Sequence, residues 1–234
     1  MVFMESDLLQ GFAEKSITKK ELLEMAESDF TLLPVLVTGV SSPKAIVRYG
    51  CASTLVDLSA KHPEKLYPHM DFFISLLDSE RRILVWNAFA AIANLCAVDA
   101  DKKFEVIFNK YYAFLNDEFM VTVANVVGNS AKIARAKPYL IPRITSELLG
   151  VEKISTSPHL TEECRRVIAE QAIKSFDQFF DMMNGEDKAA VISFVKKHAD
   201  SSRASLAKQA ELFLKRWEFV KTHFPKPIFE TTSK

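Results

Sequence analysis

The chain has 234 residues and equal numbers of basic and acidic side chains, 30 Lys and Arg against 30 Asp and Glu. Apolar residues make up 48% and charged residues 26%, which excludes intrinsic disorder and fits one large or two small globular domains. The zero formal net charge lacks the basic surplus typical of nucleic-acid-binding proteins. Only 6 Gly and almost no alternating polar and apolar runs disfavour a β-rich fold.

Residues 1–61 predict a short N-terminal helix followed by three longer ones. Apolar residues within 1–17 have the amphipathic spacing of a capping helix. Thr18, with Glu21 three positions later, forms a capping box that starts a helix over 18–27. A helix over 30–40 ends at Ser41-Ser42-Pro43. The next helix, over 43–61, places four apolar residues on one face: Val47, Cys51, Leu55 and Leu58.

The stretch 83–97 is the most apolar helix that the sequence predicts. It contains no Gly, no Pro and no charged residue, and its alanines leave room for neighbouring helices to come close. A bilayer span needs about 20 apolar residues, so this stretch is too short to cross a membrane. It is expected to be the central inner helix of a stack.

The chain repeats itself around this helix. Residues 47–58 align with 84–95 at an offset of 37, and the turn that precedes the first segment, 40–43, recurs at 77–80 and again at 115–118. Three expected outer helices have proline in their first turn: Leu33-Pro34, Tyr67-Pro68 and Ile141-Pro142. A repeat of this length, with an offset of 37 or 38 and two helices per unit, is typical of a solenoid.

The C-terminal part predicts two further units, the first of them stretched. Its outer helix, over 142–149, is followed by the long loop 150–160 and by an inner helix from about Thr161 that Asn184-Gly185 is expected to end. The fifth unit has helices over 186–198 and 203–217. The remaining segment, 218–234, contains Pro225 and Pro227 and is expected to form a tail that leaves the helical pattern at Phe224-Pro225.

Over residues 18–217 this pattern resembles the HEAT-repeat branch of the armadillo-type α-solenoids. The matching residues lie in the outer helices, in the turns and in the inner helices: Pro34 and Pro68; Asp78, Asp117 and Asp200; Val47-Arg48, Ala52, Ala88 and Ala124. Val85 and Thr122 replace the arginine of the Val-Arg pair in later units. The resemblance implies an all-α, right-handed α-α superhelix of about five helical hairpins and ten to twelve helices. Residues 1–217 would form the solenoid with its N-terminal cap, and 218–234 the tail.

Proteins of the HEAT type usually present their second helices on the concave side. Successive residues of an α-helix are rotated by about 100°, so with Cys51 facing the core, Tyr49 faces away from it. Trp86 occupies the equivalent position one repeat later. We therefore expect Tyr49 and Trp86 to anchor a partner, with Arg48 and Asn94 as flanking polar contacts. The alternative is that both aromatic rings pack onto the capping helix or fill a groove between units. In the third unit the same reasoning selects Thr122, Val126, Asn129 and Ser130.

Two functions from different classes remain open. The first is a non-enzymatic scaffold that binds a protein or peptide on its concave face. The second is a HEAT-like DNA glycosylase or nucleic-acid binder, which would need a cationic groove, with Tyr49 and Trp86 facing a flipped base and Asp57 as the acid. The candidate basic residues are interspersed with acids, which favours an ordinary solvated surface: Arg81, Arg82, Lys132, Arg135, Lys137, Arg143, Arg165 and Arg166.

The remaining chemistry-bearing residues predict neither a metal site nor a cofactor. Three separated cysteines, Cys51, Cys96 and Cys164, are typical of reduced thiols inside helices. The five His show no ligand spacing, and no phosphate-binding glycine loop is present. Because neither a signal peptide nor a membrane span is evident, a cytoplasmic location is expected, with no membrane partner. The oligomeric state stays open.

Overall fold

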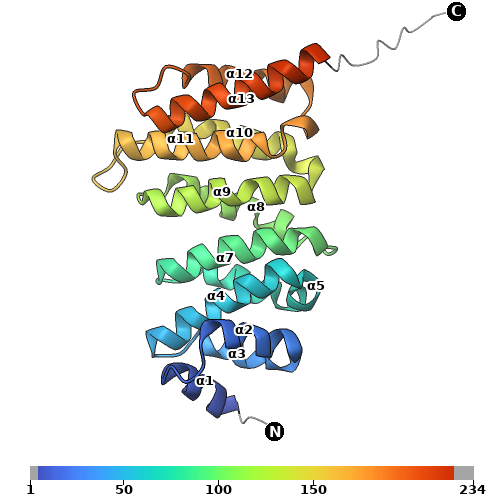
Figure 1. Ribbon diagram of the computed structural model, residues 1–234, viewed down its shortest axis with the longest axis vertical. Helices are drawn as coiled ribbons and strands as arrows, with labels where there is room; N and C mark the ends of the chain where they lie inside the picture. Colours follow the sequence, from blue (N-terminus) through green and yellow to red (C-terminus); the bar gives the residue numbers. More distant parts are fainter. Residues whose placement is uncertain (1–4, 224–234) are drawn as a thin grey trace, which may run out of the picture.

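The computed structural model describes residues 5–223, with side chains placed from residue 8 to residue 217. This part of the chain contains α-helices and short 3₁₀ helices and no strand, apart from an isolated bridge between Ser157 and Leu160. The helices stack in two rows along the long axis of the molecule (Figure 1). This is the α-solenoid that the repeats predict.

The front row in Figure 1 consists of the inner helices, which run side by side like rungs. They are α4 (Ala45–Lys61), α7 (Arg82–Leu95), α9 (Met120–Ala136), α11 (Glu162–Asp177) and α13 (Ala204–His223). The outer helices behind them are α3 (Leu33–Gly39), α5 (Pro63–Leu66), α6 (Met70–Ser75), α8 (Lys103–Ala113), α10 (Ile141–Leu149) and α12 (Gly185–Lys197). At the N-terminal end lie α1 (Glu5–Ala13) and α2 (Lys19–Ser28).

Short 3₁₀ helices connect or extend these elements. They are η1 (Phe30–Leu32), η2 (Tyr67–His69), η3 (Leu76–Asp78), η4 (Cys96–Val98), η5 (Phe114–Asn116), η6 (Pro138–Leu140), η7 (Gly150–Lys153) and η8 (Phe180–Met182). Within residues 5–223 the thirteen α-helical segments occupy twelve positions, because η2 at Tyr67-Pro68 divides the outer helix of the second unit into α5 and α6.

The spacing of the inner helices confirms the predicted period. The first residues of α4 and α7, Ala45 and Arg82, differ by 37 in number, and α9 begins at Met120, an interval of 38. The two later intervals, to Glu162 and then to Ala204, are both longer because the connections around α10 and α12 contain additional residues. The first three inner helices are therefore close structural equivalents.

Local signals fix the ends of several helices as predicted. Thr18 and Glu21 form a full capping box: the Thr18 N–H donates to Glu21 Oε2 at 2.7 Å, and the Glu21 N–H donates to Thr18 Oγ1 at 3.2 Å. Pro34, Pro68 and Pro142 each occupy the first turn of their segment. Backbone N–H groups in the first turn have no partner within the helix, so proline, which lacks an N–H, costs no hydrogen bond there.

Helix α7 lies at the centre of the core. Eight of its fourteen residues are buried, and Ala88, Ala91 and Ile92 have no exposed surface. Small side chains here allow α4 and α9 to pack closely on both sides. The ring of Phe89, also fully buried, meets the edges of Tyr111 and Phe114 with centroids 5.1 and 5.0 Å apart.

The N-terminal helix packs on α4 by close backbone approach. Gly50 lies beneath the ring of Phe12 from α1, and a Cβ at this position would overlap that ring. Phe12 is buried as a result. Helix α1 therefore covers the first repeat, as expected for a capping helix, and Gly50 is required for its fit.

Two predictions about individual residues are wrong. Asn184-Gly185 does not stop a helix; α11 ends at Asp177, and the Asn184 side chain accepts the N–H of Asp187 as the N-cap of α12. In the third unit, the residues expected to point outward include three buried ones: Thr122, Val126 and Ser130. The alignment behind that expectation paired Trp86 with Thr122, whereas the start of α9 at Met120 pairs Trp86 with Ala124, about 200° around the helix.

Helix α13 continues to His223, past the expected start of the tail at residue 218. Phe224, Pro225 and the rest of the tail lie outside the described residues. Among the helices of residues 5–223, none combines the length and apolarity that a bilayer span requires.

Candidate partner-binding face

The inner helices α4, α7 and α9 present equivalent residues on one surface, which we call the ladder face. Three rows define it, and the members of each row occupy the same position in successive repeats: Ile46, Ile83 and Val121; Ser53, Ala90 and Gly128; Asp57, Asn94 and Lys132. The inner helices that carry them run side by side in Figure 1.

The first row is apolar and open to solvent. Ile46 is 41% exposed, Ile83 42% and Val121 41%, although large apolar side chains in helices of this kind are normally buried. One turn further along, Asn87 Nδ2 donates to the Ile83 carbonyl at 2.7 Å and Asn125 Nδ2 to the Val121 carbonyl at 2.8 Å. Each amide keeps an oxygen acceptor and a second N–H that can bind another molecule.

The second row leaves space on this surface. Ser53, Ala90 and Gly128 have small side chains or none, and a Cβ built at Gly128 would meet no atom within 4 Å. A band of low relief therefore runs between the apolar first row and the polar third row. An extended chain could lie here with its backbone close to the helices.

Asn94, one of the predicted contacts, connects three inner helices. Its Nδ2 donates to Ser59 Oγ of α4 at 3.0 Å, and its Oδ1 accepts a hydrogen bond from Lys132 Nζ of α9 at 2.8 Å. The amide is thereby held in one orientation. Burial lowers the pKa of Lys132, and the neutral amide of Asn94 offers it no opposite charge.

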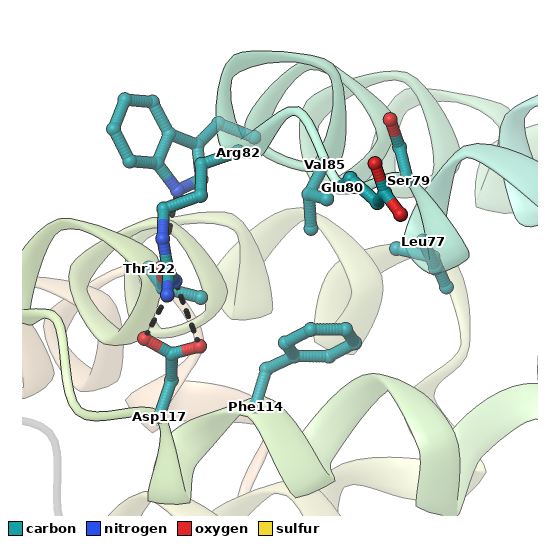
Figure 2. A pocket seen from close by; sticks show the side chains of 9 residues that line it. Leu77, Ser79, Glu80, Arg82, Val85, Phe114, Asp117 and Thr122 are labelled. Atoms are coloured by element: carbon teal, nitrogen blue, oxygen red, sulfur yellow. Dashed lines mark hydrogen bonds and ion pairs between the residues drawn. The ribbon is translucent and has the colours of Figure 1, made fainter.

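Trp86 lies in a groove between the second and third units. Its indole Nε1 donates to Thr122 Oγ1 of α9 at 3.2 Å, and its ring is half-buried against the core. It lines a cavity of about 260 Å³ with η3, η5 and the start of α7. Figure 2 shows the Arg82 side chain extending along one side of this cavity to Asp117, whose two carboxylate oxygens each accept a hydrogen bond at 3.2 Å.

Arg48 and Tyr49 lie at the first turn of α4. The Arg48 guanidinium donates through Nη1 to the carbonyls of Ser42 and Pro43, at 2.8 and 3.2 Å, and so holds the turn that precedes its own helix. Its Cζ lies 4.7 Å from the centroid of the half-buried Tyr49 ring. Asn94 is eight positions beyond Trp86, roughly 12 Å along the helix, so the four predicted residues do not form one cluster.

Several of the cations that the sequence grouped as a possible basic strip have separate partners. Arg165 pairs with Glu162 at 2.7 Å and Arg166 with Glu163 at 3.1 Å. Arg143 lies on the outer helix α10, with its guanidinium carbon 3.9 Å from the Phe108 ring centroid. Lys137 is buried. Asp57, the acid required by the glycosylase alternative, forms an ion pair with Lys19 at 2.7 Å.

A buried ion pair between α8 and the end of α9 was not predicted from the sequence. Lys137 Nζ, just after α9, lies 3.0 Å from Asp99 Oδ2, in the connection before α8, and 3.0 Å from Glu105 Oε2 of α8. The Lys137 and Asp99 side chains are at most 4% exposed. Burial alone would lower the pKa of Lys137, but the hydrogen bonds and charges of Asp99 and Glu105 raise it above its usual range. Lys137 and Asp99 are one repeat apart, and only the solenoid brings them together.

In the part of the chain that the structure describes, no group of three His, Cys, Asp or Glu side chains is arranged to hold a metal ion. Cys51 and Cys96 are buried and Cys164 is half-buried, and all three are unpaired. Burial raises the pKa of the Cys51 thiol to about 12, so this group is a poor nucleophile.

Several solved structures share this fold. The designed armadillo repeat protein YIII(Dq)4CqI is 21% identical, with 90% of this chain and 92% of that chain covered and a TM-score of 0.58. The designed armadillo repeat protein YIII(Dq.V1)4CPAF, in complex with the peptide (KR)4, is 17% identical, with 88% and 90% covered and a TM-score of 0.60. A computationally designed armadillo repeat protein for modular peptide recognition is 19% identical, with 90% and 92% covered and a TM-score of 0.55.

This protein thus has the fold of the armadillo-type α-solenoids. At these identities the likeness concerns the fold. No protein-family model and no curated protein sequence matches the chain.

Proposed function

We propose that this protein is a non-enzymatic scaffold whose ladder face, expected to be the concave side, binds an extended segment of a protein or peptide partner. Two of the structural neighbours are described as a complex with a peptide and as designs for peptide recognition, which supports a role of this kind. Trp86 and Asn94 contribute a ring edge and an oriented amide, and Tyr49 and Arg48 border the face at α4. The proposal includes a cytoplasmic location, which three unpaired cysteines support.

The observation that carries this proposal is the exposed apolar row. Ile46, Ile83 and Val121 lie on three successive helices roughly 10 Å apart, each about two-fifths exposed. A single exposed apolar residue needs no explanation, but three at equivalent positions form a patch that a partner can cover. The asparagines beside the row supply hydrogen bonds for a peptide backbone.

Nucleic-acid binding is the competing function. It would require base stacking on exposed rings, yet Trp86 and Tyr49 are both half-buried and Trp86 is bonded to Thr122. The ion pairs of Arg165 and Arg166 also interrupt the basic strip. These contacts favour a protein partner.

Affinity capture from cell lysate tests the proposed function. An Ile83→Ser, Val121→Ser double variant should lose partners that the wild-type chain retains, because the substitutions remove two of the three apolar side chains of the first row. Val106→Ser is the matched control, since Val106 is 85% exposed on the outer helix α8. Partners that stay bound to the double variant and are lost only with Val106→Ser would place binding on the outer face and overturn the proposal. Nuclease treatment of the lysate identifies partners held through nucleic acid.

A further inference from the structure

The three helices of the ladder face contain more basic than acidic residues. Helices α4, α7 and α9 together contain five basic residues and one acidic residue, a formal charge of +4 in a chain whose net charge is zero. The basic residues are Arg48, Lys61, Arg82, Lys132 and Arg135, and the acid is Asp57. The compensating acids lie elsewhere, on turns and on other helices.

Carboxylates from neighbouring elements reach only part of this charge. Glu27 of α2 pairs with Lys61 at 2.8 Å, and Asp117 pairs with Arg82. By contrast, Lys132 and Arg135 are bonded to neutral acceptors, the Asn94 amide oxygen at 2.8 Å and the Gln178 carbonyl at 2.9 Å. Among the described residues, neither of these two cations forms an ion pair.

Acids on the other inner helices are already engaged. Asp57 binds Lys19, and Glu170 of α11 binds Lys174, Arg203 and the Ser205 hydroxyl. Asp177 binds Arg216 and the Trp217 indole. Of the two inner helices that flank α9, α7 contains no acid, and each of the four acids of α11 is already in an ion pair. This end of the ladder face is therefore complementary to a negative ligand.

We propose that the partner segment is acidic: an extended peptide whose carboxylates meet Lys132 and Arg135 while its apolar side chains cover Ile83 and Val121. This inference rests on the proposed function and specifies the chemistry of its partner. Burial lowers the pKa of Lys132, and a carboxylate beside it would raise this pKa again. A peptide is favoured over nucleic acid because the same face offers an apolar row, which a phosphate backbone would leave uncovered.

A selection from a displayed library of random peptides tests the inference directly. Peptides about ten residues long suffice to cross three or four helices spaced roughly 10 Å apart, at about 3.3 Å per residue. We expect the enriched sequences to contain more Asp and Glu than Lys and Arg, with interspersed apolar residues. Binding of an enriched peptide should weaken as salt is raised.

Two double variants then locate the contact. Lys132→Met with Arg135→Met should weaken the enriched peptide roughly three- to tenfold, as expected for the loss of two solvent-accessible ion pairs. The matched control, Lys102→Met with Lys196→Met, removes two exposed cations far from the ladder face and should leave affinity unchanged. The salt dependence of the wild-type chain gives an independent answer if a variant folds poorly.

The outcomes separate this inference from the function beneath it. If no peptide is enriched, the proposed function fails and the inference fails with it. If basic or uncharged peptides are enriched and Ile83→Ser, Val121→Ser abolishes their binding, the function stands and the acidic partner is wrong. The inference is overturned if an oligonucleotide of similar length binds more tightly than the enriched peptide, displaces it, and loses this affinity in the Lys132→Met, Arg135→Met variant. The two cations would then bind nucleic acid.

Discussion

At the scale of single residues, the contact between the two helices of the third unit depends on Lys137. Its ammonium group is enclosed by Asp99 and Glu105, and Asp99 also accepts the N–H groups of Lys103 and Phe104 and the Tyr67 hydroxyl. Asp99 thus caps α8 and receives Lys137 from α9 at the same time. This carboxylate therefore joins the two helices of the third unit to each other and, through the Tyr67 hydroxyl, to the second unit.

Replacing Lys137 with methionine should destabilise the protein by about 3–5 kcal/mol, because it leaves the Asp99 charge buried without its partner. Urea unfolding followed by circular dichroism measures the change. The matched control is Lys19→Met, which breaks the exposed Lys19–Asp57 pair and should cost less than about 1 kcal/mol. Equal losses for the two variants would show that the buried pair has no special role.

The same carboxylate predicts a response to acid. Burial would raise the pKa of Asp99, but the N–H groups of Phe104 and Lys103, the Lys137 ammonium and the Tyr67 hydroxyl lower it overall. A lowered folded-state pKa stabilises the protein above the ordinary carboxyl pKa of about 4, and this stabilisation is lost as the pH falls through the folded-state value. The stability difference between wild type and Asp99→Asn should therefore shrink below about pH 4. A difference that stays constant from neutral pH into strong acid would contradict this.

Ala88 tests the packing of α7. It has no exposed surface, and a larger side chain would push α7 away from its neighbours, so Ala88→Leu should destabilise by about 1–3 kcal/mol. Thermal unfolding measures the effect. Ala60→Leu, in the exposed last turn of α4, should change stability little. An unchanged melting temperature for Ala88→Leu would mean that α7 is not the packed centre.

At the scale of elements, two glycines in equivalent inner helices have opposite roles. Gly50 admits the Phe12 ring of α1, whereas Gly128 faces open space. Gly50→Ala should displace α1 and increase hydrogen exchange of its amides. Gly128→Ala should stabilise by about 0.5–1 kcal/mol, because alanine loses less backbone entropy in a helix. Stabilisation by both substitutions would show that α1 does not depend on the close approach at Gly50.

The sequence predicts where helices begin and end better than it predicts which face of each helix is turned toward the core. Offsets of 37 and 38 located the inner helices, and the capping box at Thr18 placed a boundary correctly. The face of α9 was missed because Trp86 was paired with Thr122, an offset of 36, whereas α7 and α9 begin 38 residues apart. Two residues rotate every later position by about 200°. Asn184-Gly185 was misread because Asn and Gly occur at both ends of helices, and only the following residues decide which end is present.

At the scale of the whole molecule, the candidate surface arises from the stacking of units. Ile46, Ile83 and Val121 form one row because their helices begin 37 and 38 residues apart, whereas the reading of the sequence selected the aromatic residues Tyr49 and Trp86. The pairing of Lys137 with Asp99 crosses one full repeat and has no local signature in the sequence. Charge balance over the chain likewise concealed the +4 of α4, α7 and α9.

The central claim is that partners bind across the ladder face, and site-specific photo-crosslinking tests it most directly. A photoreactive phenylalanine analogue at position 83 should form an adduct with the captured partner, because Ile83 lies in the middle of the apolar row. The same analogue at position 106, on the outer helix α8, should form none. Adducts from position 106 with none from position 83 would contradict the account and move the binding surface to the outer row of helices.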